Sequence, residues 1–448
     1  MMATITETRS RLINSVLARR FIGGASWSLV GSALYQAINL VTMLFIARML
    51  GKETYGQFVL LQSTFNSIGI FAGFGIGTTA TRYVAAFKHN NPVRLGHILA
   101  LSERTVILFG VLASTGLMLF ASWLATDLLH TPSLATPLAL AAFAVLFSAM
   151  DGYQKSTLIG FESMRAYAIG TVAGAIISLP IMLIAASAFG LHGLAWALAG
   201  TTFIQAGISR YQVTCELKRF AICLDGGGCW KEWLILRDFA LPALLAGVMV
   251  TPAHWICQTM LAKSPNGYAE IALLGVAMQW FNAILFIPMV AGRVVAPMLT
   301  EAVASDNYTD SKRILILAIK ANAIIALPLA LFIAVLSRWI LLLYGTAFGN
   351  GSMVLAIAVA TAALLAIQTP VGNMVAATSR MWLGMAMNFG WALIYITTSK
   401  LLIDRGAIGV IISLGLAYVI HAIWTFIFAY IQLKSPNTKG YLINYVKQ

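Results

Sequence analysis

The feature that most constrains this chain is a series of long apolar blocks, each close to the roughly 20 residues that a helix needs to cross a membrane. Lipid offers the backbone no hydrogen-bond partner, so each block must pair its own peptide groups as a helix. The blocks are too long and continuous for the strands of a membrane barrel. The predicted spans are 21–47, 57–86, 101–125, 138–160, 166–189, 193–214, 238–262, 270–296, 314–338, 352–376, 382–403 and 408–431.

Composition leads to the same class of protein. Only 10% of the 448 residues are charged and 60% are hydrophobic, whereas soluble domains carry roughly 25% charged residues. A water-facing surface could not be built from so few charges. We therefore predict an all-α polytopic membrane protein with about twelve transmembrane helices.

The basic residues predict the orientation. With both termini in the cytoplasm, 23 of the 29 Lys and Arg fall on the cytoplasmic side, as the positive-inside rule requires. This distribution accounts for the net charge of +14 without a nucleic-acid partner. Arg19 and Arg20 precede a full-length apolar block rather than a short signal sequence, so we expect the first helix to stay as an anchor.

The chain reads as two copies of one six-helix unit, at an offset of about 215 residues. Gly190 and Gly193, in the expected turn between helices five and six, correspond to Gly406 and Gly409. An even number of spans per copy gives both halves the same orientation, as in transporters with parallel repeats. The predicted segments are a cytoplasmic N-terminal segment 1–20, a bundle 21–214, a cytoplasmic linker 215–237, a second bundle 238–431 and a cytoplasmic tail 432–448. Two facing bundles would enclose a cleft that opens to either side, so the architecture favours transport by alternating access.

Enzyme signatures are absent from the sequence. It contains no phosphate-binding G-x-x-x-x-G-K-[ST], no H-E-x-x-H and no G-x-S-x-G. We expect neither an enzyme nor a cofactor or metal site. The four cysteines have no zinc-site spacing and are expected to be free thiols.

Polar and ionisable side chains within membrane spans are the functional candidates, because burying them in lipid is costly. Nine of them lie on predicted helices one, two, seven and eight, where we expect them to line the cleft and bind substrate. They are Gln36, Asn39, Asn66, Arg82, His254, Gln258, Gln279, Asn282 and Arg293.

Each candidate also has a structural interpretation that the sequence leaves open. The two arginines lie near cytoplasmic helix ends and could snorkel to the interface. The amides could join helices by hydrogen bonds, and His254 could be an interhelical histidine or carry a proton or substrate role. Asp151 and Lys155 are four residues apart and are expected to form a local ion pair. Lys320 is expected to snorkel to the cytoplasmic interface.

Four segments resemble the Wzx-type polysaccharide repeat-unit flippases of the multidrug/oligosaccharidyl-lipid/polysaccharide exporter (MOP) superfamily. The first helix is followed by ARMLGKETYGQF at 47–58, and the second closes with GFGIGTTATRYVA at 73–85. LIGFESMRAYAIG at 158–170 and GLHGLAWALAG at 190–200 occupy the family's usual places around helices five and six. The resemblance implies a fold like that of multidrug and toxin extrusion (MATE) transporters, with two six-helix bundles.

The resemblance also implies a function. Such flippases move an undecaprenyl-pyrophosphate-linked oligosaccharide from the cytoplasmic to the periplasmic leaflet of the bacterial inner membrane. The partners implied are this substrate, membrane lipids, a polysaccharide polymerase, a chain-length regulator and a coupling ion, H⁺ or Na⁺. A pyrophosphate would suit a cationic cleft, which directs attention to Arg82 and Arg293.

The sequence also bears on three alternative functions. A drug or cation exporter of the superfamily would use buried acidic residues, but the predicted spans have few carboxylates away from their ends. Peptidoglycan-precursor flippases typically carry two more C-terminal helices than the twelve expected here. A membrane-embedded glycosyltransferase or polymerase would need a large outer loop with carboxylates or arginines, whereas the expected outer loops are about 4–15 residues long.

Overall fold

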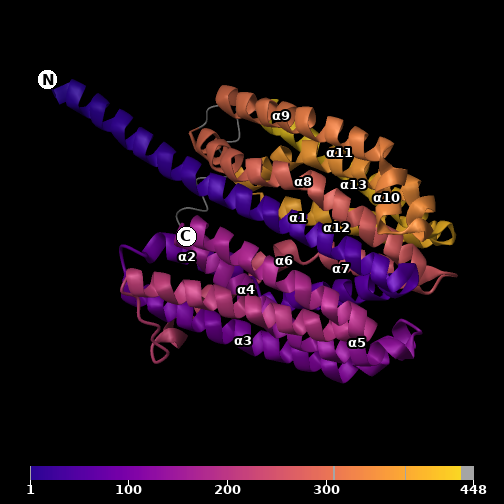
Figure 1. Ribbon diagram of the computed structural model, residues 1–448. Coiled ribbons are helices and arrows are strands. Elements are labelled where there is room, and N and C mark those ends of the chain that lie inside the picture. The colour runs from indigo at the N-terminus through magenta and orange to yellow at the C-terminus, as the bar shows by residue number, and fades with distance from the viewer. Residues whose placement is uncertain (1, 306–307, 379, 435–448) are drawn as a thin grey trace. The chain divides into compact units, whose positions relative to one another are not determined.

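The computed structural model describes residues 2–305, 308–378 and 380–434, and these residues form helices and turns without a β-strand (Figure 1). The α-helices are α1 (Met2–Gly73), α2 (Ile76–Phe87), α3 (Pro92–Trp123), α4 (Ala135–Gly160), α5 (Met164–Arg219), α6 (Leu241–Gly247), α7 (Val250–Ala262), α8 (Gly267–Ala304), α9 (Tyr308–Val335), α10 (Ser337–Tyr344), α11 (Ser352–Ala377), α12 (Met381–Leu401) and α13 (Gly406–Lys434). Short helical turns join them, among them η3 (Cys229–Glu232), η4 (Leu236–Ala240) and η6 (Ile403–Arg405). The predicted all-α class is confirmed.

Eight stretches of these residues are long and apolar enough to cross a membrane. They are Trp27–Gly73, Pro92–Leu128, Pro132–Gly160, Met164–Arg219, Gly267–Gly292, Tyr308–Val335, Thr346–Val375 and Ile403–Leu433. A ninth is the bent pair Leu236–Leu245 and Val250–Ala262, whose axes differ by 40°. The bend falls between Pro242 and Pro252, and prolines are a usual cause of helix kinks.

The helix α5 is a hairpin of two limbs. Its backbone leaves the helical region at Gly190 (φ 56°, ψ −133°). Nε2 of Gln212 donates to the carbonyl of Ala166 at 2.8 Å, and Nε2 of Gln205 donates to that of Gly170 at 3.3 Å. Residues far apart on one continuous helix could not meet in this way, so the chain doubles back at Gly190. Only glycine adopts these dihedral angles readily.

The two halves of the chain break their helices at equivalent positions. Gly406, 216 residues after Gly190, has nearly the same dihedral angles, φ 63° and ψ −143°. Gly51 and Asn266, 215 residues apart, both have positive φ, 75° and 55°. Two such pairs at the offset expected from the sequence support the parallel internal repeat.

The number of spans depends on how the broken helices are counted. Gly51 interrupts the stretch Trp27–Gly73 in the same way that Gly190 interrupts Met164–Arg219. If each of these two interrupted stretches is counted as two spans, the eight stretches become ten spans. The bent pair then makes eleven spans among the described residues. α12 is 21 residues long and would be the twelfth. The total of twelve stays a prediction.

The chain forms two compact units. Unit 1 comprises Met1–Leu50 and Leu61–Val248, and unit 2 comprises Gly51–Leu60 and Met249–Gln448. In unit 1, α4 packs against α2, α3 and α5; in unit 2, α11 packs against α8, α9 and α13. The domain boundaries and the membrane orientation expected from the sequence stay predictions.

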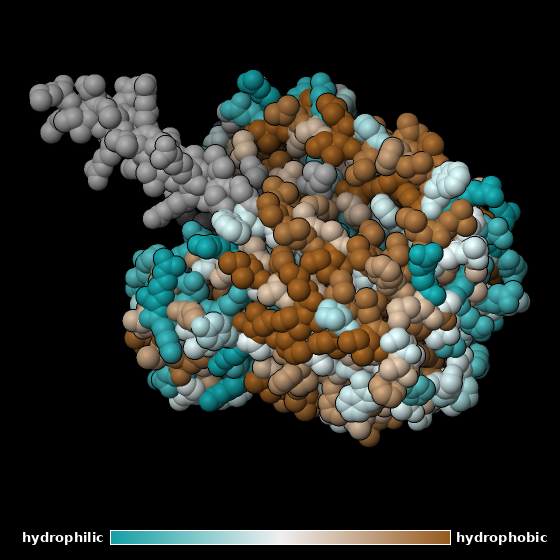
Figure 2. All heavy atoms as spheres, viewed as in Figure 1, coloured by the Kyte–Doolittle hydropathy of each residue, from teal (hydrophilic) through white to brown (hydrophobic). Residues whose placement is uncertain are grey.

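The surfaces of these helices are apolar, as a lipid-facing surface must be. Leu119 and Phe189 are each 74% exposed, and Ile324 and Val335 are each 72% exposed. Figure 2 shows hydrophobic side chains over the middle of the helices and hydrophilic ones gathered toward their ends. In water this area of exposed hydrocarbon would drive aggregation, so these helices need lipid or detergent around them.

A proline inside the bundle is accommodated by a neighbouring side chain. Pro370 in α11 has no N–H, so the carbonyl of Ala366 loses its helical partner. The amide of Asn322 in α9 donates to that carbonyl at 2.8 Å. Asn322 is 4% exposed, and its hydrogen bond lets α11 keep a proline within the membrane.

Candidate functional site

Arg82 lies on α2 of unit 1 and is exposed. Its guanidinium carbon is 4.6 Å from the ring centroid of Phe239 in η4 and 5.8 Å from that of Tyr83. No described carboxylate forms an ion pair with it. Aromatic faces orient a guanidinium without neutralising it, so the positive charge of Arg82 remains available to an anion.

The three amide candidates of unit 1 lie on α1. Gln36 and Asn39 are half-buried, and Asn66 is exposed. None of the three has a hydrogen bond to another described residue. These three amides therefore do not link described helices by hydrogen bonds. Their role in binding substrate stays a prediction.

In unit 2, His254 of α7 lies against a cluster of aromatic rings. Its ring centroid is 5.2 Å from that of Tyr395 and 5.9 Å from that of Trp391, both edge-on. The ring centroid of Trp391 is in turn 5.2 Å from that of Tyr418 in α13. Trp391 and Tyr395 are 2% and 1% exposed. The half-buried imidazole thus packs on a rigid aromatic wall contributed by α12 and α13.

Gln258 lies one turn after His254 on α7 and is 8% exposed. Its Oε1 is buried and has no hydrogen-bond partner among the described atoms, and the same holds for Nε1 of Trp391. Buried polar atoms normally have a partner. The face of α7 that carries His254 and Gln258 is therefore a candidate for binding a polar group.

Gln279 on α8 is held by two phenols. Its Nε2 donates to the hydroxyl of Tyr55 at 2.6 Å, and the hydroxyl of Tyr344 donates to its Oε1 at 3.2 Å. Both tyrosines are completely buried, and all three residues belong to unit 2. These contacts give Gln279 a structural role in joining helices, the interpretation that the sequence left open beside substrate binding.

Replacing Gln279 by leucine is expected to lower the stability of the protein by about 2–3 kcal/mol, because two buried hydroxyls lose their partner. Thermal unfolding of the purified protein in detergent, followed by tryptophan fluorescence, measures the effect. Asn282→Leu is the matched control: Asn282 is on the same helix but exposed and has no described hydrogen bond. Equal melting temperatures for the two variants would contradict the structural role of Gln279.

Arg293 lies in the backbone range of α8, but its side chain is outside the described residues. Its predicted role in binding the substrate therefore stays a prediction. The nine candidates divide between the units, with Gln36, Asn39, Asn66 and Arg82 in unit 1 and the other five in unit 2. The cleft expected between the bundles also stays a prediction.

Sequence reasoning missed the anchoring of the glycine-rich segment after α5. Arg94 of α3 forms a two-pronged ion pair with Glu232, at 2.8 and 3.0 Å, and Nη1 of Arg104 donates to the carbonyl of Gly226 at 2.9 Å. The backbone N–H of Gly227 and the ring of His97 lower the pKa of the Asp225 carboxyl. The sequence predicts a linker at 215–237, and the structure shows its residues 226–232 held against α3 by Arg94 and Arg104.

Two local expectations are confirmed in unit 1. Lys155 and Asp151 form an ion pair at 2.7 Å, and Asp151 also accepts a hydrogen bond from Ser209 at 2.6 Å. All four cysteines are free thiols. Within the described ranges, no group of three or more His, Cys, Asp or Glu is placed to hold a metal ion.

The sequence profile of the family described as "Polysaccharide biosynthesis protein" matches residues 21–303. This chain belongs to that family. Among curated proteins, it is 25% identical over 387 residues to the EPS I polysaccharide export inner membrane protein EpsE of Ralstonia nicotianae, covering 83% of this chain and 84% of the relative. It is 23% identical over 239 residues to the Lipid III flippase of Escherichia coli (strain K12). That match covers 53% of this chain and 56% of the relative.

Solved structures of MOP-superfamily transporters share the fold. A MATE family multidrug resistance transporter in an inward-facing conformation superposes with a TM-score of 0.72 at 12% identity, covering 92% of this chain and 99% of that one. A MOP superfamily transporter from Pyrococcus furiosus superposes with a TM-score of 0.71 at 13% identity. The superposition covers 94% of this chain and 96% of that one. The MATE-like fold predicted from the sequence of this polysaccharide biosynthesis protein is confirmed.

Proposed function

We propose that this protein is a flippase that moves undecaprenyl-pyrophosphate-linked oligosaccharide repeat units from the cytoplasmic to the periplasmic leaflet. The observation that carries the proposal is the family match over residues 21–303. The names of two relatives, one for polysaccharide export and one for a lipid flippase, support it. The transporter fold supports transport by alternating access, in which one central site opens to each side in turn.

The side chains on the candidate helices suit such a substrate. A lipid pyrophosphate is anionic, and Arg82 offers a positive charge without a described carboxylate partner. A glycan needs donors and acceptors, which Gln36, Asn39, Asn66 and Gln258 can supply. Flipping makes and breaks no covalent bond, so the protein needs no catalytic group.

The setting of this activity is the bacterial inner membrane. The basic residues favour an orientation with both termini in the cytoplasm, since that topology places 23 of the 29 Lys and Arg on the cytoplasmic side. The lipid tail of the substrate would remain in the bilayer while the head group passes through the protein. A gradient of H⁺ or Na⁺ can drive the cycle, and a polymerase with its chain-length regulator would consume the product.

Loss of the protein is expected to stop the pathway after the lipid-linked unit is complete. Deleting the gene should abolish surface polymer and accumulate finished single repeat units on undecaprenyl pyrophosphate. These units should be inaccessible to an impermeant glycan-modifying reagent applied to intact spheroplasts. Extraction and mass spectrometry of the lipid-linked intermediates give their size, and the reagent gives their sidedness.

The same experiment separates the other candidate functions. A polymerase defect would leave single units exposed on the periplasmic side, and a glycosyltransferase defect would leave truncated glycans. A drug exporter's deletion would change sensitivity to toxic cations and leave the polysaccharide intact. Complete units that the reagent reaches in the deletion strain would refute the flippase proposal.

A further inference from the structure

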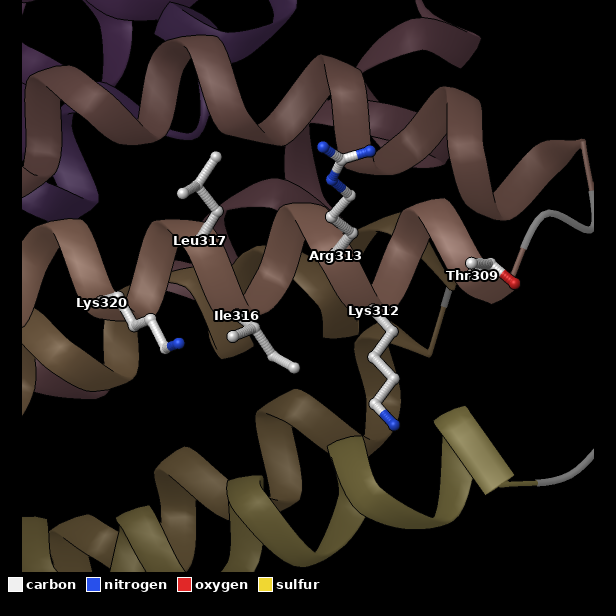
Figure 3. Close-up of a pocket in the computed structure, with 6 residues that line it drawn as sticks. All are labelled: Thr309, Lys312, Arg313, Ile316, Leu317 and Lys320. Atoms are coloured by element: carbon white, nitrogen blue, oxygen red, sulfur yellow. The ribbon is translucent and has the colours of Figure 1, made fainter.

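A basic face on the N-terminal part of α9 has no role in the function proposed above. Thr309, Lys312, Arg313, Ile316, Leu317 and Lys320 line an open pocket of about 330 Å³ (Figure 3). All six residues belong to unit 2. The pocket lies at the start of the candidate membrane span Tyr308–Val335, at the end that is expected to meet the cytoplasm.

The positively charged side chains of this face are exposed. Lys312, Arg313 and Lys320 are all exposed, and none of them forms an ion pair with a described carboxylate. Lys312 and Lys320 are eight residues apart, which places them about 80° apart around the helix and about 12 Å apart along its axis. In Figure 3 the side chain of Lys320 extends back toward the N-terminal end of α9, on the side where Lys312 lies.

An apolar stripe continues from the basic face into the membrane. Leu317, Ile324 and Leu331 recur every seven residues and are 67%, 72% and 66% exposed. They cover about 21 Å of the helix surface. A molecule with an anionic head and a hydrocarbon chain would match both parts, since its head would meet the cations and its chain would lie along these side chains.

We propose that this face of α9 binds an anionic glycerophospholipid of the inner leaflet. The phosphodiester accepts hydrogen bonds from Lys312 and Lys320, Arg313 adds positive charge from the other side of this face (Figure 3), and the acyl chain packs on Leu317 and Ile324. The pocket residues include no amide, aromatic ring or carboxylate that would hold a sugar. This composition favours a phospholipid over the lipid-linked oligosaccharide as the occupant.

Native mass spectrometry of the purified, delipidated full-length protein tests the proposal. The probes are phosphatidylglycerol, phosphatidylcholine and undecaprenyl phosphate, each titrated separately. The wild type is expected to bind phosphatidylglycerol at least about tenfold more tightly than phosphatidylcholine, and the triple variant K312Q/R313Q/K320Q should lose this preference. The matched control R338Q/K400Q/R405Q removes three exposed positive charges at other helix ends and should keep the preference within about twofold.

The outcomes are distinct. Selective loss of phosphatidylglycerol binding in the α9 triple variant, with the same monodisperse elution as the wild type, supports the site. Equal loss in both triple variants overturns it in favour of a general charge effect. Tighter binding of undecaprenyl phosphate than of phosphatidylglycerol at these cations overturns the assignment of the occupant. Because lipid binding is read without transport, the result is independent of the flippase proposal.

Discussion

Arg82→Ala is expected to reduce surface polysaccharide at least about tenfold at normal protein level, because a charge-assisted hydrogen bond to the substrate pyrophosphate is lost. Arg82 is exposed on α2 and is oriented by Phe239 at 4.6 Å. Its charge meets no described carboxylate, so removing it breaks no described ion pair of the fold. Arg82→Lys should retain part of the activity, since lysine keeps the charge but loses the two-pronged geometry of arginine.

The control for Arg82 is Arg405→Ala, an exposed arginine at the turn before α13 that is expected to face the periplasm. It should leave polysaccharide unchanged. Polymer is quantified per cell, and protein is quantified by an epitope tag in the membrane fraction. If Arg82→Ala made as much polymer as the wild type at equal protein level, Arg82 would not bind the pyrophosphate. Its side chain would then only snorkel to the membrane interface.

Gly56→Ala is expected to prevent stable folding. Gly56 belongs to the part of α1 that packs in unit 2, and a Cβ atom there would be 1.8 Å from the carbonyl oxygen of Tyr268 and 2.6 Å from its carbonyl carbon. Both atoms are backbone at the start of α8, so no side-chain rotation relieves the overlap. We expect a loss of about 3 kcal/mol or more, and little protein in the membrane.

Gly69→Ala on the same helix is the matched control for Gly56. Apart from its chain neighbours and its own helix backbone, no described atom lies within 4 Å of the Cβ position at Gly69. Alanine there should be neutral, or stabilising by about 0.5–1 kcal/mol, because it restricts the unfolded chain. Heating the detergent-solubilised protein and measuring the monomer that remains by size-exclusion chromatography compares the two variants. Equal melting temperatures would show that α1 and α8 approach less closely than the structure describes.

Several local features could be read from the sequence because they depend on residues close together in the chain. The turn at Gly190 and its equivalent at Gly406 follow from glycine's access to positive φ. The pair Asp151 and Lys155 follows from the spacing of an α-helix.

Roles that depend on a distant partner could not be read in this way. Gln279 looked like other polar residues of the spans until the structure placed it between Tyr55 and Tyr344, which are 224 and 65 residues away. The sequence marked 215–237 only as a linker, but Glu232 within it pairs with Arg94, 138 residues earlier. No periodicity in the sequence encodes such partners.

The sequence by itself determined that this protein is a helical membrane protein with an internal repeat and a polysaccharide-biosynthesis resemblance. Partition into lipid depends on the hydrophobicity of each block, and helix breaks depend on single residues, so both are local properties. Only the tertiary structure decided which polar side chains are occupied in holding helices together, as Gln279 and Asn322 are. It also decided which charges, such as those of Arg82 and Lys320, have no described carboxylate beside them, because a charge is compensated only by residues that the fold brings near.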